Sequence, residues 1–131
     1  MLPLFAGVDF EQDREVVAAA DFPEKLLETV QKILDERKAE DIVTVALAGR
    51  SALADYMVIA SGQSGRQLLA LADYLDEAFR KAGVVNVRIE GKTDANWVLV
   101  DAGDVIVHLF LPDVRAYYDL DTLWSKSPEA E

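Results

Sequence analysis

Three aspartates at the ends of predicted strands have the clearest potential for catalysis. Asp55 opens a buried strand, and Asp101 and Asp104 flank a tight turn between two later strands. A nucleotidyltransferase centre holds two Mg²⁺ ions with paired carboxylates, usually an Asp-x-Asp pair and a third acid. Met57 occupies the second position of that pattern. A small Mg-dependent nucleotidyltransferase-like enzyme that uses Asp55 with Asp101 or Asp104 is therefore only the alternative function, because aspartate is also an ordinary turn residue.

The other candidates for chemistry have simple structural explanations. His108 lies inside an apolar strand, and the sequence identifies no nucleophile or carboxylate partner for it, which favours a core or interface histidine. Residues 62–66 (GQSGR) open a helix, and helix N-termini bind anions. This stretch lacks the lysine of a phosphate-binding loop, so a helix cap explains Ser64.

Composition excludes several classes of site. The chain has no cysteine and a single histidine, which removes disulfides, thiolate zinc sites, cysteine nucleophiles and histidine-rich metal sites within one chain. We expect no cofactor and no metal. The formal net charge of −11 disfavours direct nucleic-acid binding as the main mode and favours a partner with a basic or apolar patch.

The hydropathy pattern predicts a cytoplasmic protein. No segment approaches 18 uninterrupted apolar residues, so no membrane span is expected. The N-terminus lacks the basic start and long apolar run of a signal peptide, and it lacks the arginine content of a mitochondrial presequence.

The 131 residues predict one domain with two acidic ends. Residues 1–22 carry a net charge of −4 and are expected to form an N-terminal extension, partly disordered. Residues 23–118 form the single α/β domain. Residues 119–131 carry a net charge of −3, and we expect this segment to dock through Leu120, Leu123 and Trp124 with a free acidic end.

Hydrophobic periodicity predicts two main helices and five strands. One helix covers about 23–38, and the other begins after Ser64, whose spacing to Gln67 fits a capping box, and ends at Gly83. The helix between the second and third strands is a crossover, which predicts that these two strands run parallel, whereas the last two form an antiparallel hairpin. The expected fold is α/β (α+β mixed), with a five-stranded mixed sheet formed by residues 42–48, 56–60, 85–89, 97–100 and 105–111.

Trp97 begins a predicted strand directly after the polar loop 91–96. Trp97 and Leu99 share one face of that strand, and Val98 and Val100 share the other. Apolar residues on both faces mean that helices cover both, or that one face is an exposed patch for a partner. Tryptophan is enriched at interaction hot spots, and a core tryptophan is equally compatible with the sequence.

Three stretches carry motifs in the order in which one family has them. Residues 55–67 (DYMVIASGQSGRQ) resemble an Asp-Tyr strand that runs into a Thr-Gly-x-Ser-x-Arg-Gln helix start. Residues 97–108 (WVLVDAGDVIVH) resemble a Trp-to-His hairpin, and residues 115–124 (RAYYDLDTLW) resemble an Arg-x-Tyr-Tyr-x-Leu-x-x-Leu-Trp signature. The family is the ribosomal silencing factors, also called RsfS or Iojap-like proteins. The resemblance covers about residues 23–124, with departures at Ala54, Met57 and Ala102.

This resemblance implies a nucleotidyltransferase-like fold without the catalytic set, and therefore no enzymatic activity. Family members bind the large ribosomal subunit through large-subunit ribosomal protein fourteen and sterically block subunit joining, which represses translation. Related members assist large-subunit biogenesis. The resemblance also implies that Trp97 contacts the ribosomal partner.

The partner is expected to be a basic ribosomal protein, which would attract an acidic domain. Acidic extensions would at the same time disfavour indiscriminate binding to ribosomal RNA. A second copy of the chain is the alternative occupant of an exposed strand face, so a homodimer remains open. The expected partner-binding residues are two apolar and four acidic side chains: Trp97, Leu99, Glu90, Asp94, Asp101 and Asp104.

Overall fold

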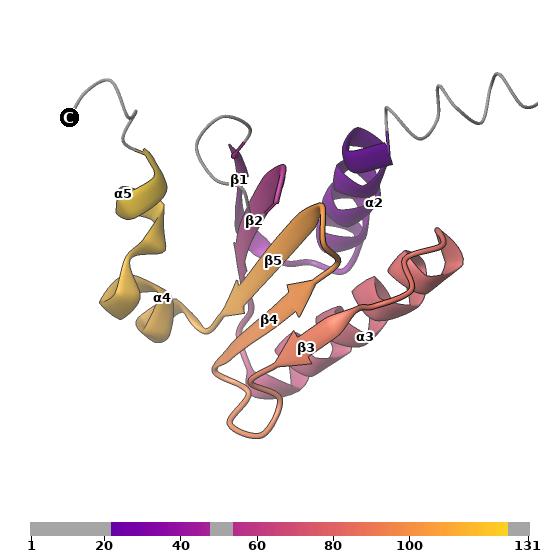
Figure 1. The fold of residues 1–131 in the computed structure, drawn as a ribbon. Coiled ribbons are helices and arrows are strands. Elements are labelled where there is room, and N and C mark those ends of the chain that lie inside the picture. Colours follow the sequence, from indigo (N-terminus) through magenta and orange to yellow (C-terminus); the bar gives the residue numbers. More distant parts are fainter. Residues whose placement is uncertain (1–21, 48–53, 126–131) are drawn as a thin grey trace, which may run out of the picture.

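The computed structural model describes residues 22–47 and 54–125. Most of the expected N-terminal extension and the acidic end after residue 125 lie outside these ranges. The described chain folds as a mixed α/β domain (Figure 1). Its elements are α2 (Phe22–Glu36), β1 (Glu40–Ala46), β2 (Tyr56–Ser61), α3 (Gly65–Lys81), β3 (Arg88–Glu90), β4 (Trp97–Asp101), β5 (Val105–Phe110), α4 (Pro112–Tyr118) and α5 (Leu120–Ser125).

The five strands form one mixed sheet in the order β1-β2-β5-β4-β3. β2 pairs in parallel with β5, and the β1–β2, β5–β4 and β4–β3 pairs are antiparallel. The expected hairpin is therefore confirmed. β2 and β3 do run in the same direction, but β5 and β4 lie between them. The crossover through α3 leads to the far edge of the sheet because the final hairpin inserts next to β2.

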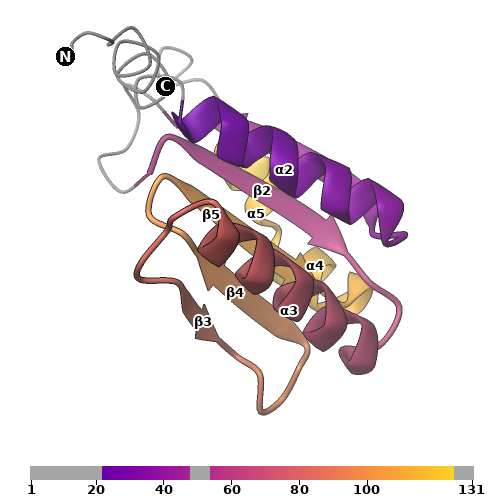
Figure 2. The ribbon, with the colours of Figure 1, turned by 90° about the vertical axis from the view of Figure 1, so that its right-hand side faces the viewer.

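The two main helices cover one face of the sheet. Figure 2 shows α2 and α3 side by side across it, and the larger core cluster lies between these helices and the strands. α2 contributes Leu26, Val30 and Leu34, spaced four residues apart so that they fall on one side of the helix. α3 contributes a stripe of five buried residues that ends at Phe79. Burial of these stripes fixes both helices to the sheet.

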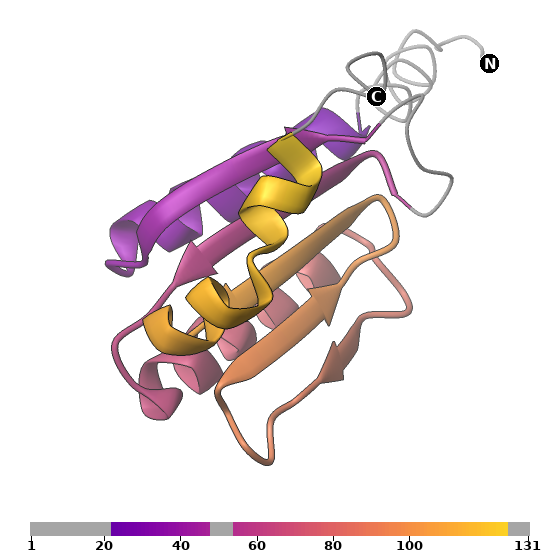
Figure 3. The same cartoon turned by 90° about the vertical axis from the view of Figure 1, so that its left-hand side faces the viewer.

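The opposite face of the sheet is covered only in part. Figure 3 shows α4 and α5 lying over the β1, β2 and β5 side, with β4 and β3 left uncovered. A smaller core cluster lies under these two helices, and Leu120 and Trp124 pack against it. Leu123, which was expected to dock with them, is 63% exposed.

The start of α3 follows the predicted cap with one change. The Ser64 hydroxyl accepts the backbone N–H of Gln67 at 3.1 Å. The side chain of Gln67 accepts the N–H of Gln63 at 2.7 Å, whereas the predicted capping box places this bond on Ser64. The same side chain donates to the carbonyl of Lys38, so it also joins α3 to the turn after α2.

The third strand is shorter than predicted. Only Arg88–Glu90 pair with β4, and Val85, expected in the strand, is 84% exposed. Arg88 lies opposite Asp101, the last residue of β4, so residues before Arg88 have no strand beside them. Within residues 22–47 and 54–125, no helix has the length and apolar character needed to cross a membrane.

Candidate functional site

The uncovered part of the sheet collects most of the predicted binding residues. Val98 and Val100 point to the large core under α2 and α3, so Trp97, Leu99 and Asp101 lie on the other face. The register places Leu99 between His108 of β5 and Glu90 of β3. We call seven residues on this side the open face: Arg88, Glu90, Trp97, Leu99, Asp101, Ile106 and His108.

Trp97 is the most constrained side chain of the open face. Its indole Nε1 donates a hydrogen bond to Nδ1 of His108 at 3.0 Å. The ring stacks on the buried ring of Phe110, with centroids 4.9 Å apart, and touches the ring of Tyr118 at 4.7 Å. The side chain is only half-buried, so these contacts fix its orientation and leave part of the indole accessible.

His108 supports Trp97 and stays uncharged. Burial lowers the pKa of His108 to about 4, so the imidazole is neutral at pH 7. Because Nδ1 accepts the indole proton, Nε2 carries the ring proton. The ring neighbours of His108 are Trp97 and Phe110, which favours a positioning role in the core or at an interface.

The loop before β4 is shaped around Trp97. Gly91 adopts a φ of 89°, and a Cβ at this position would overlap the backbone carbonyl oxygen of Trp97. Only glycine fits this close approach. The N–H of Ala95 donates to the carbonyl of Gly91 at 3.0 Å, which closes the loop and directs the chain into β4.

The structure brings two of the four predicted acids onto the open face. Glu90 and Asp101 both lie near the guanidinium of Arg88, at 2.7 and 3.8 Å, so Arg88 offsets part of their charge. Asp94 lies in the loop before Trp97, at one end of β4. Asp104 lies in the turn after β4, at the opposite end of the strand from Trp97.

Of the three aspartates that the enzymatic alternative would use, Asp55 and Asp104 lie beside each other through backbone hydrogen bonds. The backbone carbonyl of Asp104 accepts the N–H of Asp55 at 2.9 Å and that of Tyr56 at 3.1 Å, so the turn lies beside the start of β2. Within the described ranges, no group of three His, Asp or Glu side chains is arranged to hold a metal ion. The side chain of Asp101 accepts the N–H of Gly103 at 2.8 Å, as expected of a turn-forming aspartate.

Sequence reasoning missed the contribution of α4 to this region. Tyr118 touches Trp97, and Tyr117 packs edge-on against Tyr118 at 5.0 Å. Arg115 anchors the helix through the buried hydroxyl of Ser61, 54 positions away in the chain. The aromatic character of residues 117–124 was a signal that this segment docks, but it did not show that α4 would reach Trp97.

Comparison with known proteins gives a consistent family. The model of a family described as "Ribosomal silencing factor during starvation" (RsfS) matches residues 19–131. The chain is 48% identical over 109 residues to the ribosomal silencing factor RsfS of Zymomonas mobilis, a match that covers 83% of this chain and 82% of the relative.

A more distant relative and a solved structure extend this result. The mouse protein named "Mitochondrial assembly of ribosomal large subunit protein 1" is 33% identical over 102 residues, which cover 76% of this chain and 45% of the mouse protein. A crystal structure of a Chromobacterium violaceum protein superposes with a TM-score of 0.74 at 39% identity, over 80% of this chain and 88% of the other. The sequence matches thus agree on one family, and the solved structure shares the fold.

Proposed function

The chain belongs to the RsfS family of ribosomal silencing factors, and on this premise we propose that it binds the large ribosomal subunit and blocks joining of the small subunit. The proposed contact is large-subunit ribosomal protein fourteen, the proposed location is the cytoplasm, and the proposed result is repression of translation. The name of the mouse relative supports a further role in assembly of the large subunit.

The observation that carries this proposal is the open face with its fixed tryptophan. Trp97 is held by His108, Phe110 and Tyr118, so little conformational entropy is lost when a partner covers it. Leu99 lies next to it on the same strand, and together they offer an apolar centre. Glu90 and Asp101 border this centre with two carboxylates, of which Arg88 offsets one charge, so the border keeps a net negative charge that complements a basic protein.

The block itself is proposed to be steric. A folded chain of this length has a radius of gyration of about 14 Å. A body of that size, bound at the joining face, occupies space that the small subunit needs. No catalytic step is required.

We propose accordingly that the chain is not an enzyme. Asp55 and Asp104 lie near each other, but Met57 stands where a second metal carboxylate is expected and is itself buried. A calorimetric titration with Mg²⁺ and nucleoside triphosphates should show no saturable heat. Nucleotide transfer that disappears in the Asp55→Ala variant would reverse the ranking of the two functions.

Sucrose-gradient analysis with purified subunits tests the main proposal. The protein should sediment with large subunits and not with small ones, and pre-bound protein should reduce the joined-ribosome peak. Trp97→Ala should lose this effect, and Tyr74→Ala is its matched control. Tyr74 is an exposed aromatic residue on α3, which packs on the other face of the sheet. An unchanged joined-ribosome peak at saturating protein would overturn the proposal.

A second copy of the chain is the competing occupant of the open face. Two copies would bury the same apolar centre against each other, as in a two-fold interface. Sedimentation velocity of the protein alone, and then with large subunits, separates the cases. If only the monomer binds large subunits, the second copy and the large subunit use the same open face. If the intact dimer binds large subunits, they use different faces.

A further inference from the structure

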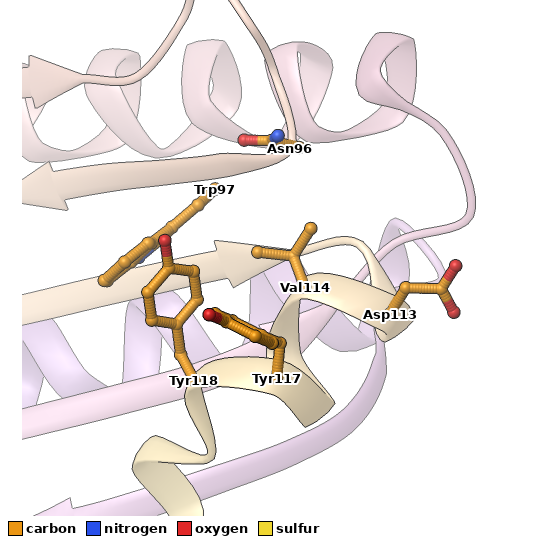
Figure 4. Close-up of a pocket in the computed structure, with 6 residues that line it drawn as sticks. All are labelled: Asn96, Trp97, Asp113, Val114, Tyr117 and Tyr118. Atoms are coloured by element: carbon orange, nitrogen blue, oxygen red, sulfur yellow. The ribbon is translucent and has the colours of Figure 1, made fainter.

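A pocket of about 370 Å³ lies beside Trp97, between the start of β4 and helix α4 (Figure 4). Asn96 and Trp97 form one side of it, and residues of α4 form the other. The carbonyl of Asn96 accepts the N–H of Leu111, the residue that caps α4, at 3.0 Å, which holds the two sides together. The lining residues are Asn96, Trp97, Asp113, Val114, Tyr117 and Tyr118.

Aromatic rings dominate the walls of this pocket. The rings of Trp97 and Tyr118 are in contact, and Tyr117 stands perpendicular to Tyr118. Tyr117 is 81% exposed, so its ring can receive a ligand without any rearrangement of the core. A tyrosine left this open on a short helix is not explained by packing within the described chain.

The pocket has one acidic residue, whose carboxylate lies at the outer edge (Figure 4). Asp113 in the first turn of α4 is the only charged residue among the six that line it. Arg115 on the same helix donates its hydrogen bonds to Asp121 and Ser61 instead.

We propose that this pocket binds a cationic side chain, arginine or lysine, of a basic partner protein; this inference rests on the proposed function and specifies the chemistry of the contact. Cations are attracted to the faces of tryptophan and tyrosine rings, and a carboxylate at the border strengthens that attraction. The chain already uses this geometry elsewhere: the guanidinium of Arg37 lies 3.7 Å from the ring centroid of Tyr74. RNA is disfavoured as the occupant because Asp113 repels phosphate.

A small-molecule titration tests the selectivity of the pocket directly. N-acetyl-arginine methylamide should shift the NMR signals of the Trp97 indole N–H and of the backbone amides of residues 113–118. N-acetyl-citrulline methylamide has nearly the same shape without the charge and should shift them much less. The lysine analogue shows which cation is preferred. Equal shifts with the arginine and citrulline compounds, or none with either cation, would overturn the proposal.

Variants then connect the pocket to ribosome binding. Asp113→Asn and Tyr117→Ala should each weaken co-sedimentation with large subunits by about 2- to 30-fold. The matched controls are Asp73→Asn and Tyr74→Ala, which change an exposed acid and an exposed tyrosine on α3. Thermal melting checks that all four variants stay folded.

The outcomes separate this inference from the proposed function. If the parent protein and both pocket variants bind large subunits equally well, the cation pocket is overturned and the proposed function stands. Parent protein that does not bind large subunits overturns the proposed function, and the arginine and citrulline titration then decides the selectivity of the pocket by itself.

Discussion

The indole of Trp97 is fixed by a polar and an aromatic contact at once. His108 accepts its N–H, and Phe110 supports its face. A half-buried ring in one orientation can contribute to binding without the entropy cost of ordering it. Trp97 is thus neither of the two simple alternatives that the sequence allowed, because its inner side packs against the smaller core cluster and its outer side remains accessible.

The first prediction concerns truncation of this ring. Trp97→Ala should weaken large-subunit binding by roughly 30- to 1000-fold, as expected of a hot-spot anchor. Because the ring is only half-buried, the loss of stability should stay below the 3–5 kcal/mol or so expected for a fully buried aromatic residue. Thermal melting and co-sedimentation measure the two effects separately. A collapsed melting transition would show that Trp97 is above all a core residue.

The second prediction concerns the pH dependence of stability. The pKa of His108 in the folded chain is lowered to about 4, whereas an unfolded histidine titrates near 6.5. Between pH 6.5 and 4 the unfolded chain binds a proton on this histidine and the folded chain does not, so protonation favours unfolding. The neutral His108 therefore contributes fully to the free energy of unfolding above about pH 6.5, and this contribution is lost as the pH falls toward 4. The loss should be on the order of 3 kcal/mol.

Chemical denaturation of the parent chain and of His108→Phe measures this contribution. The variant keeps an aromatic ring but has no proton to gain, so its stability should fall less between pH 6.5 and 4.5. In the folded parent chain, protonation of Nδ1 removes the acceptor of the Trp97 N–H, so the indole NMR signal should shift near pH 4, where folded His108 titrates. Identical pH profiles for the two proteins would contradict the prediction.

At the scale of elements, local pattern was sufficient for the two main helices and for the final hairpin, but it did not predict the short helices α4 and α5. The apolar stripes of α2 and α3 and the cap at Ser64 are encoded within a few residues of each other. The order of the strands is not encoded in this way. β5 pairs with β2 although α3, β3 and β4 lie between them in the sequence, and only packing of the whole sheet selects that neighbour.

The same distinction applies to the candidate site, where local spacing predicted some features and long-range packing determines the others. The alternation within β4 predicted that Trp97 and Leu99 share a face. The hydrogen bond from Trp97 to His108 depends on the register of the hairpin, and the contact with Tyr118 depends on where α4 docks. Sequence spacing carries little information about that docking, because the hydrogen bond that anchors α4 joins Arg115 to Ser61, 54 positions away in the chain.

The third prediction concerns the clamp that holds α4 and α5. The guanidinium of Arg115 donates to both carboxylate oxygens of Asp121, at 3.0 and 2.7 Å, and to the Ser61 hydroxyl at 2.7 Å, and its side chain is only 11% exposed. These hydrogen bonds also lower the pKa of the Asp121 carboxyl. Arg115→Met keeps the apolar stem and leaves Asp121 and Ser61 without this donor, which should cost about 1–3 kcal/mol.

Hydrogen exchange locates this effect. In Arg115→Met, backbone amides of residues 112–125 should exchange faster, whereas those of β2 and β5 should remain protected. Arg80→Met is the control, because Arg80 forms an exposed ion pair with Asp76 along α3 and its loss should change stability by less than about 0.5 kcal/mol. Equal destabilisation by the two substitutions would show that the clamp has no special role.

At the scale of the whole molecule, the two sides of the sheet have different tasks. α2 and α3 bury one face completely enough to stabilise the domain, and the other face is left open over β4 and β3. The net charge of −11 acts on both sides and over a longer range than any single contact. Such a charge would attract a basic protein and repel the phosphates of ribosomal RNA, so in the proposed complex these two effects oppose each other.

The last prediction follows from that opposition. Raising the salt concentration from about 0.1 M to about 1 M shortens the screening length from about 10 Å to about 3 Å. Binding to the isolated basic ribosomal protein should therefore weaken steeply, because only attraction is screened. Binding to the whole large subunit should weaken less, because repulsion by the surrounding RNA is screened at the same time. Titrations of both targets over one salt series measure the two slopes, and a steeper slope for the whole subunit would mean that the acidic chain is not repelled by the RNA around its site.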